Sequence, residues 1–292
     1  MSTSMSGSTR LADYVDQRRI GDATVTVISE GSLVWPPKFP VAESEWRAAM
    51  PEANEAGEVK LGLNLAHVRL GDASIMIDPG CDDPGSAWQQ GFARRFKDVT
   101  RTPGLARALE LIGERPDEIT HVLITHGHGD HFAGTTVEHG DELVARFPNA
   151  RHYIGRADWE GNPYRERPDS EIAMSLGTID RLGLLETVDR EREIVPGVTM
   201  VPAPGESPGH SVVRVRTGGG SFYYLGDLFH HACEVSHPDW VSPGRDQAAM
   251  RASRDWLFAD AGTEATLVFA HEGFPGWGHF VLANGGYRWE LG

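Results

Sequence analysis

Short runs of apolar residues, closed by glycine, proline or aspartate, recur along the chain and predict mainly β-strands. The predicted strands cover residues 24–28, 61–70, 74–78, 119–125, 151–154, 198–202, 212–216, 222–225 and 265–270. Apolar residues spaced three and four apart predict helices over 43–50, 102–112, about 170–186 and 245–258. A series of strands followed by a helix therefore occurs twice.

The connections between the predicted strands decide the fold class. Gly71 and Asp72 form a two-residue turn signal between two strands, and such turns join antiparallel neighbours. A doubly wound parallel sheet is therefore disfavoured. We predict an α/β fold, a four-layer sandwich whose two similar halves contain mixed, largely antiparallel sheets. No low-complexity linker interrupts residues 21–292, so we expect a single domain there, and we expect the polar residues 1–20 to be a frayed leader.

Composition excludes several classes of protein. The chain has 292 residues, 40% hydrophobic and 24% charged, which is the balance of a folded protein. No apolar run reaches the roughly 18 to 20 residues that a membrane span needs, and the N-terminus lacks the apolar core of a secretory signal. We therefore expect a cytoplasmic protein without a membrane partner. In that reducing compartment Cys81 and Cys233 are expected to be free thiols.

Charge narrows the range of partners. The net charge is −15, and the arginines are scattered among acidic residues, so a nucleic-acid backbone would meet a repulsive field. We expect a small-molecule substrate and no nucleic acid. Association of the chain as a homodimer stays an open alternative.

The strongest chemical signal is the segment THGHGDH. It places His126, His128, Asp130 and His131 directly after a buried type of strand, in a chain with 13 histidines. Neutral imidazoles and carboxylates are the ligands that zinc and similar metals prefer, and the two interposed glycines let the backbone turn so that the side chains converge. The first two histidines can face one metal ion, and the aspartate and the third histidine can face another.

This segment resembles the metal-binding loop of the metallo-β-lactamase superfamily, and the resemblance extends over about residues 20–292. The family's later ligands are matched by His210 in PGHS, Asp227 in YLGD and His271 in VFAH. The resemblance implies the family's αββα sandwich. It implies one metal on His126, His128 and His210, a second metal on Asp130, His131 and His271, and Asp227 as the bridge. Asp78 in IDPG matches the family's aspartate that orients ligand histidines.

The ligand set implies a hydrolase. Two neighbouring metal ions, expected to be zinc with manganese, cobalt or iron as alternatives, would hold a bridging hydroxide as the nucleophile and polarise the bond to be cleaved. Asp130 could carry the proton of the water to the leaving group. We expect the substrate to be a small neutral lactone or ester, with a phosphotriester as a further candidate.

The segments after the later ligands favour one branch of the family. The run HEGFPGWGHF resembles the branch that contains methyl parathion hydrolase and some acyl-homoserine lactonases. The better-known lactonases carry a tyrosine three residues after the bridging aspartate, whereas this chain has His230, as methyl parathion hydrolase-like proteins tend to have. We expect His230 to be catalytic, as a donor to the developing oxyanion. Persulfide dioxygenases with one iron and glyoxalase II-like thioester hydrolases are the alternatives.

Aromatic residues are expected to form the substrate pocket. The candidates are Trp35, Phe39, Trp240, Phe274 and Trp277. With no clustered Lys or Arg near the ligands, such a pocket favours apolar groups over anions. Aromatic residues are also common core residues, and the sequence leaves open whether Cys81 or His231 contributes to the site.

Overall fold

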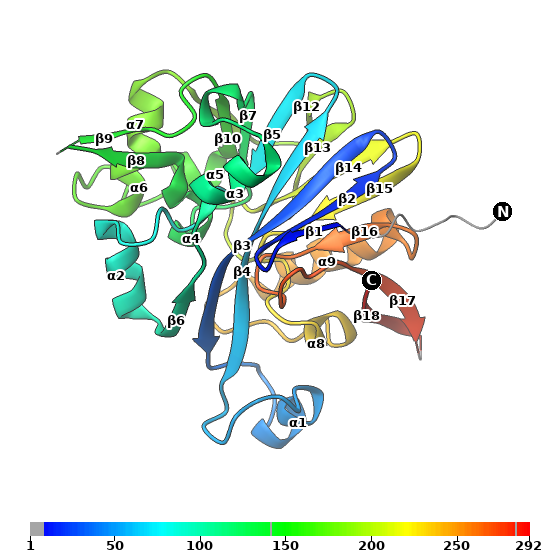
Figure 1. Ribbon diagram of the computed structural model, residues 1–292. Helices are drawn as coiled ribbons and strands as arrows, with labels where there is room; N and C mark the ends of the chain where they lie inside the picture. The colour runs from blue at the N-terminus through cyan, green and yellow to red at the C-terminus, as the bar shows by residue number, and fades with distance from the viewer. Residues whose placement is uncertain (1–8, 141, 284) are drawn as a thin grey trace.

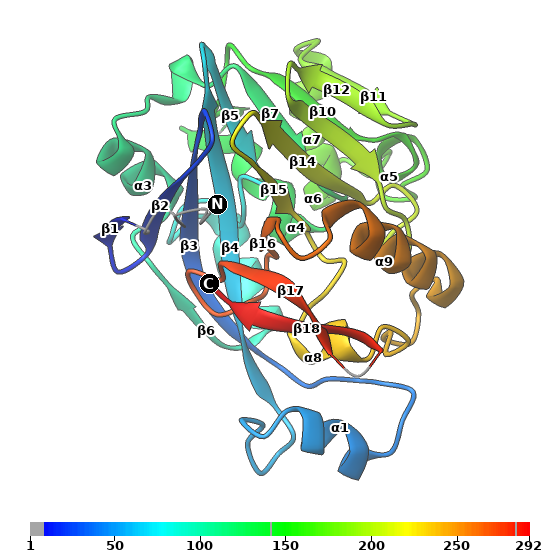
Figure 2. The ribbon, with the colours of Figure 1, turned by 90° about the vertical axis from the view of Figure 1, so that its right-hand side faces the viewer.

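The computed structural model describes residues 9–140, 142–283 and 285–292. Two β-sheets lie face to face at its centre, and helices cover the outer surface of each (Figure 1, Figure 2). This arrangement confirms the four-layer αββα sandwich. No helix in the described ranges has both the length and the apolar composition needed to cross a membrane.

The first sheet is mixed. Its members are β1 (Thr9–Ala12), β2 (Val15–Ile20), β3 (Ala23–Trp35), β4 (Val59–Leu70), β5 (Ala73–Ile77), β7 (His121–Ile124), β10 (Arg151–Gly155) and β11 (Leu185–Val188), in that order, with β6 (Lys97–Arg101) beside β3. Strands β1 to β5 pair antiparallel, and β5, β7, β10 and β11 pair parallel. The hairpin predicted at Gly71 is confirmed, since Leu70 faces Ala73 across it.

The second sheet is antiparallel except at one position. Its members are β12 (Arg192–Val195), β13 (Val198–Pro202), β14 (Ser211–Thr217), β15 (Gly220–Tyr224), β16 (Thr266–Val268), β17 (Gly278–Ala283) and β18 (Gly286–Leu291). Only β15 and β16 run parallel among these described strands. A separate hairpin joins β8 (Thr136–His139) to β9 (Glu142–Ala145).

The helices are mostly short. They are α1 (Glu43–Ala49), α2 (Ala87–Arg95), α3 (Leu105–Ile112), α4 (Gly129–Phe132), α5 (Arg156–Glu160), α6 (Glu171–Met174), α7 (Leu176–Arg181), α8 (Cys233–Ser236), α9 (Gln247–Ala261), and the 3-10 turns η1 (Pro116–Glu118) and η2 (Ala133–Thr135). The single helix predicted over 170–186 is therefore divided into α6 and α7, followed by a strand. Gly183, at φ +70°, adopts the left-handed conformation that turns the chain from α7 into β11.

The alternation of side chains along the strands builds the core between the sheets. Val25 and Val27 of β3 face the second sheet, whereas Ile28 faces the helices on the other side. Val213 and Val215 of β14 face the first sheet in the same way. Both sheets thus bury one apolar face against each other and the other face against helices.

The outer layers complete the sandwich. Helices α3, α6 and α7 pack on the first sheet through Leu109, Ile172 and Leu176, and α9 packs on the second sheet through Leu257. Helix α1 lies apart, beyond the ends of the long strands β3 and β4, as both views show (Figure 1, Figure 2). Its Trp46 contributes to a separate apolar cluster with residues of those strands.

The direction of the strands determines where the candidate ligands lie. Strands β5 and β7 run parallel, as do β15 and β16, so the carboxyl ends of each pair lie at one edge of their sheet. Strand β14 is antiparallel to β15, so its amino end lies at the same edge. The segments that follow or precede these strand ends carry the histidines and aspartates of the motif, which brings residues far apart in sequence to one place.

The predicted leader is wrong for the described residues 9–20, which form β1 and β2; residues 1–8 lie outside the described part. Strand β2 pairs with β3 from Val15 to Ile20, and both of these side chains are buried. The edge strand β1 and its neighbour β2 need few apolar residues, because ladders of backbone hydrogen bonds supply the rest of their attachment. Composition alone therefore missed it.

Trp277 is a core residue and does not line a substrate pocket, which corrects the sequence-based expectation. Its side chain is 1% exposed and belongs to the cluster between the two sheets. Its indole Nε1–H donates to Asp16 Oδ1 at 2.7 Å, and the Arg18 guanidinium lies 4.8 Å from the ring centroid. These contacts attach β2 to the second half of the chain.

We predict that Trp277→Ala lowers the free energy of unfolding by about 3–5 kcal/mol, because it opens a cavity in the core and removes the donor to Asp16 Oδ1. Leu282→Ala is the control on the adjacent strand, since Leu282 is 73% exposed, and should change stability by less than about 0.5 kcal/mol. Chemical denaturation measures both. Equal losses for the two variants would contradict this assignment.

Candidate metal centre

The candidate ligands come from loops at one edge of the two sheets. His126 and His128 lie between β7 and α4, and Asp130 and His131 belong to α4. The remaining predicted ligands adjoin strands of the second sheet: His210 precedes β14, Asp227 follows β15 and His271 follows β16. Each half of the sandwich therefore supplies part of the site.

A buried aspartate on α5 holds two of these loops together. Asp158 Oδ2 accepts a hydrogen bond from Gly127 N at 2.8 Å, and Oδ1 accepts one from Gly209 N at 2.6 Å. An added Cβ at Gly209 would meet the Asp158 backbone nitrogen at 2.5 Å, so this approach requires glycine. The loop with the first histidines and the loop with His210 are thereby fixed relative to each other.

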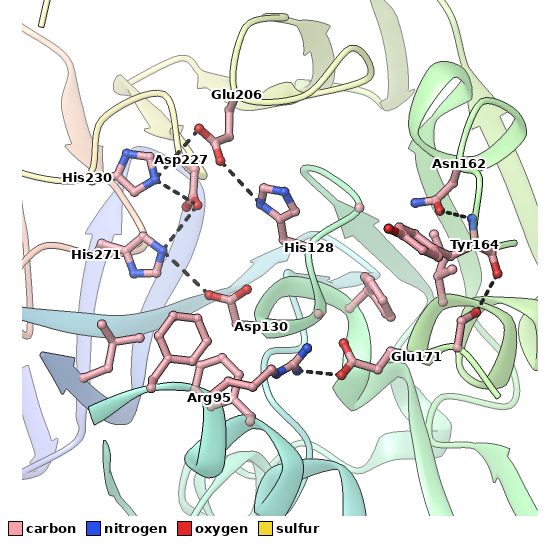
Figure 3. Close-up of a pocket in the computed structure, with 18 of the residues that line it drawn as sticks. Arg95, His128, Asp130, Asn162, Tyr164, Glu171, Glu206, Asp227, His230 and His271 are labelled. Carbon is pink, nitrogen blue, oxygen red and sulfur yellow. Dashed lines mark hydrogen bonds and ion pairs between the residues drawn. The ribbon is translucent and has the colours of Figure 1, made fainter. Parts of the chain in front are cut away.

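Asp227 is the centre of the cluster. Its Oδ1 lies 3.3 Å from His131 Nε2, and its Oδ2 lies 3.3 Å from His271 Nε2 and 3.6 Å from His126 Nε2. Asp130 Oδ2 lies 3.7 Å from His131 Nε2 and 3.8 Å from His271 Nε2. Figure 3 shows Asp130, Asp227 and His271 turned toward one another.

The spacing of these atoms fits metal ions. Zinc–ligand bonds of about 2.0–2.1 Å in a tetrahedron place neighbouring ligand atoms about 3.3–3.4 Å apart. Within the described residues, three groups have all their donor atoms within 4.8 Å of one another. The groups are His126, His128, Glu206 and Asp227; Asp130, His131 and His271; and Asp227, His230 and His271.

Unpaired buried atoms point to the same conclusion. His131 Nε2 and Asp227 Oδ1 are buried and have no hydrogen-bond partner in the described parts of the chain. A polar atom in this state is costly unless another group satisfies it, and a cation would do so for the imidazole nitrogen and the carboxylate oxygen alike. The residues present therefore fit a metal centre.

Hydrogen bonds behind the histidines leave their Nε2 atoms directed at the cluster. Asp78 Oδ2 lies 2.8 Å from His131 Nδ1, and its two oxygens also accept from the amide and the hydroxyl of Thr125, each at 2.7 Å. His271 Nδ1 lies 2.9 Å from the carbonyl of Gly62, and His210 Nδ1 lies 3.0 Å from that of Ala203. Such partners fix the orientation and tautomer of a ligand histidine. Asp78 thus lies where the resemblance placed it.

The electrostatics of the cluster are those of closely packed opposite charges. Burial opposes ionisation of Asp227, but the facing imidazoles of His271 and His131 hold its pKa well below the usual range. Burial, and then the neighbouring His131 and His128, lower the pKa of His126 well below its usual value. The aspartate is therefore an anion and His126 is neutral, which are the forms that bind metals.

His210 lies beside the cluster but outside the three groups. Its ring centroid is 5.1 Å from that of His126, and its Nε2 accepts a hydrogen bond from Asp227 N at 3.1 Å. The side chain is fully buried. The structure therefore brings His210 to the site, with its Nε2 directed at the backbone of Asp227.

His230 is held between two rings. It stacks on Trp35 at 5.8 Å and on His271 at 5.5 Å, and its Nε2 lies 3.4 Å from Asp227 Oδ2 and 3.9 Å from Glu206 Oε2. Burial lowers the pKa of His230, but the carboxylates of Glu206 and Asp227 outweigh it and raise the pKa to about 9. A protonated ring here can donate from Nε2 toward the cluster.

A cavity of about 710 Å³ opens over these residues. Aliphatic and aromatic side chains form much of its wall, and they are Leu33, Trp35, Leu61, Phe92, Phe96, Phe132, Tyr164 and Ile172. Asp130, His128, His230 and His271 lie at its floor. Figure 3 shows this floor on one side and Tyr164 with its neighbours on the other.

Of the predicted pocket aromatics, Trp35 alone belongs to this cavity in the described residues. Phe39 and Trp240 are buried behind Trp35, with ring centroids 5.9 Å from Trp35 to Phe39 and 5.3 Å from Phe39 to Trp240. Phe274 lines a different, smaller cavity with Gly62. These three predictions are corrected: the rings of Phe39 and Trp240 are buried among other apolar side chains, and Phe274 lies at the other cavity.

Cys81 and His231, which the sequence left open as contributors to the site, do not line the cavity. The Cys81 side chain is buried and its amide donates to Glu30 Oε2 at 2.5 Å. His231 Nε2 pairs with Glu52 at 2.6 Å, and its Nδ1 accepts from Cys233 N. Both side chains have other partners than the cluster.

Sequence reasoning missed the charged residues of the cavity. Arg245 pairs with Glu206, and Arg95 pairs with Glu171 at 2.5 Å, so two single arginines, although no cluster of them, lie at the cavity. A signal existed for Glu206, since it lies four residues before His210 in the same PGESPGH run. The arginines come from α2 and from a loop before α9, and nothing local in the sequence placed them here.

Comparison with known proteins finds relatives over a large part of the chain. A protein-family model described as the metallo-beta-lactamase superfamily matches residues 66–271. A probable metallo-hydrolase of Mycobacterium tuberculosis is 28% identical over 202 residues, covering 57% of each chain. An N-acyl homoserine lactonase of Bacillus cereus is 25% identical over 153 residues, which are 50% of this chain and 55% of the lactonase. The chain thus spans little more than half the length of these curated relatives.

Solved structures share the whole fold. One described as the hydrolase AbOPH in the beta lactamase superfamily has a TM-score of 0.79 at 22% identity, covering 96% of this chain and 98% of that one. One described as AidC, a dizinc quorum-quenching lactonase, has a TM-score of 0.72 at 21% identity, covering 99% and 98%. At this identity the likeness establishes the fold.

We predict that Asp78→Asn weakens metal binding about 10- to 100-fold, because the amide cannot accept from both Thr125 and His131 as the carboxylate does. Metal titration of chelator-treated protein measures the affinity. Asp82→Asn is the matched control, since Asp82 is also buried but pairs with Arg146. Unchanged affinity in Asp78→Asn would exclude the orienting role.

Proposed function

The chain belongs to the metallo-β-lactamase superfamily, and from this premise we propose that it is a metal-dependent hydrolase of small neutral lactones or esters. The observation that carries the proposal is the cluster around Asp227, which gathers imidazole and carboxylate donors beside a cavity whose wall is partly apolar. The lactonase names among the relatives and structural neighbours support the choice of lactone. A phosphotriester remains the second substrate class to test.

We propose two zinc ions, held by the residues that the family pattern assigns: His126, His128 and His210 for one, Asp130, His131 and His271 for the other, with Asp227 between them. Bound metal ions of this kind lower the pKa of water and polarise a carbonyl or phosphoryl oxygen. The remaining chemistry is assigned to the protein's own groups.

Asp130 and His230 are the proposed proton-handling residues. The Asp130 side chain is 16% exposed and lines the cavity, so its carboxylate can hold a proton and release it to a leaving alcohol. His230 lines the cavity between Trp35 and His271, and its ring can donate a hydrogen bond to an oxygen that gains negative charge. The stacking on both faces limits its rotation.

The charges in the cavity favour a neutral substrate. Both arginines that line it are paired with carboxylates, Arg95 with Glu171 and Arg245 with Glu206, and Asp130 adds a further negative charge. An anionic substrate would have to displace one of these pairs. The apolar wall can instead bury an acyl or aryl group, at about 0.8 kcal/mol for each methylene.

The test is a hydrolysis panel with metal-analysed protein. We expect neutral lactones and aryl esters to be cleaved, with kcat/KM rising with apolar chain length, and activity to be lost on chelation and restored by zinc. Faster cleavage of an anionic glutathione thioester would replace this proposal with a glyoxalase-like function. Oxygen consumption with one bound iron would replace it with a dioxygenase.

We predict that His230→Ala lowers kcat about 100-fold or more, the usual cost of losing such a donor, while metal content stays at the wild-type level. His231→Ala is the control, since His231 is paired with Glu52 at 2.6 Å. Steady-state kinetics and metal analysis of both variants decide the matter. Wild-type kcat in His230→Ala would make this ring structural.

A further inference from the structure

Glu206 is a buried carboxylate at the edge of the histidine and aspartate cluster around Asp227. It lies in the loop between β13 and β14, and its side chain is 0% exposed. Its Oε1 is 3.4 Å from His128 Nδ1, and that nitrogen is 2.8 Å from His126 Nε2. Figure 3 shows Glu206 directed at His128 and His230. The Glu206 carboxylate therefore lies beside His128 Nδ1, which in turn lies beside His126 Nε2.

The partners of Glu206 leave one of its oxygens incompletely satisfied. Arg245 Nε donates to Oε2 at 2.6 Å. Arg245 Nη2 lies 2.6 Å from Oε1 as an ion pair without hydrogen-bond geometry, so Oε1 accepts no hydrogen bond from any described residue. A buried carboxylate oxygen in this state has lone pairs available for another cation.

A second buried glutamate, Glu114, shows how the same kind of pair is arranged away from the cluster. Glu114 is paired with Arg69, which donates to both of its oxygens, and Ser74 Oγ donates to Oε2 at 2.9 Å. Both oxygens of Glu114 are thus hydrogen-bonded. Oε1 of Glu206 differs, since it has an ion pair with Arg245 Nη2 but no hydrogen bond from the described residues.

We propose that Glu206 is an additional ligand of the metal held by His126 and His128. The donor atoms of these three residues and Asp227 all lie within 4.8 Å of one another, and the 3.4 Å separation of Oε1 and His128 Nδ1 is that of neighbouring ligands. Arg245 holds the carboxylate in place from the cavity side. The inference concerns metal binding and does not depend on which substrate is hydrolysed.

A second carboxylate changes the character of this subsite. Carboxylates are harder ligands than imidazoles and suit manganese as well as zinc. A further ligand also raises the coordination number. Relative to a set of three histidines and one aspartate, the Glu206 set therefore favours metals that accept five or six ligands, such as cobalt(II) and manganese(II).

The experiment is a cobalt(II) titration of the chelator-treated full chain, followed by calorimetry and by visible absorption. We expect Glu206→Gln to weaken one of the binding events at least about tenfold and to increase the absorbance per cobalt, because fewer ligands remain. Glu114→Gln is the matched control and should leave both readouts unchanged. Binding and spectra of Glu206→Gln that overlay the wild type would overturn the proposal.

A second comparison tests whether Glu206 binds the metal or only neutralises Arg245. It also covers the case in which Glu206→Gln alone is unstable. In the Arg245→Met background, Glu206→Gln no longer leaves the partly exposed Arg245 guanidinium without its carboxylate. If Glu206 is a ligand, the double variant still binds cobalt more weakly than Arg245→Met alone. If the two bind cobalt equally and share one spectrum, Glu206 acts only through Arg245 and the proposal is wrong. Hydrolysis is not a readout, so this result is independent of the proposed function.

Discussion

The burial of the Asp227 carboxylate is the constraint on which the rest of the site depends. Four imidazoles lie within 3.6 Å of it, and one of its oxygens has no hydrogen bond within the described residues. A charge in this position is tolerated only if opposite charges are brought to it and held there. The parallel strand pairs at one edge, the Asp158 contacts between loops and the partners behind the histidines all serve that requirement. The sandwich is the frame that lets both halves reach this carboxylate.

The parts of the site that follow local rules could be predicted from the sequence. The HxHxDH loop, the glycines that let it turn, and the strands that precede Asp227 and His271 are short-range features, and each was predictable from the local sequence. The walls of the cavity could not be predicted, because they depend on which distant segments meet. Arg245 reaches Glu206 from a loop before α9, and Trp277 is buried by β2, a strand whose polar composition concealed it.

His230 connects the cavity wall to the histidine and aspartate cluster around Asp227. Its ring lies between Trp35, which belongs to the wall, and His271, which belongs to the cluster. Trp35 in turn rests on Phe39, which rests on Trp240. A substitution in this stack would therefore shift the donor nitrogen of His230 relative to Asp227, even where the substituted residue does not contact a metal ligand. The apolar core behind Trp35 thus determines how accurately a polar group is placed.

The metal ligands and the cavity wall come from different parts of the fold, and this affects how such a protein can acquire new substrates. The ligands adjoin strands and loops that are fastened to the central sandwich, whereas much of the cavity wall comes from α2, from residues 162–172 and from the Arg245 loop. These segments contribute little to the core between the sheets. Insertions and substitutions there can accumulate at small cost in folding free energy, so one inherited reaction centre can be fitted to new substrates.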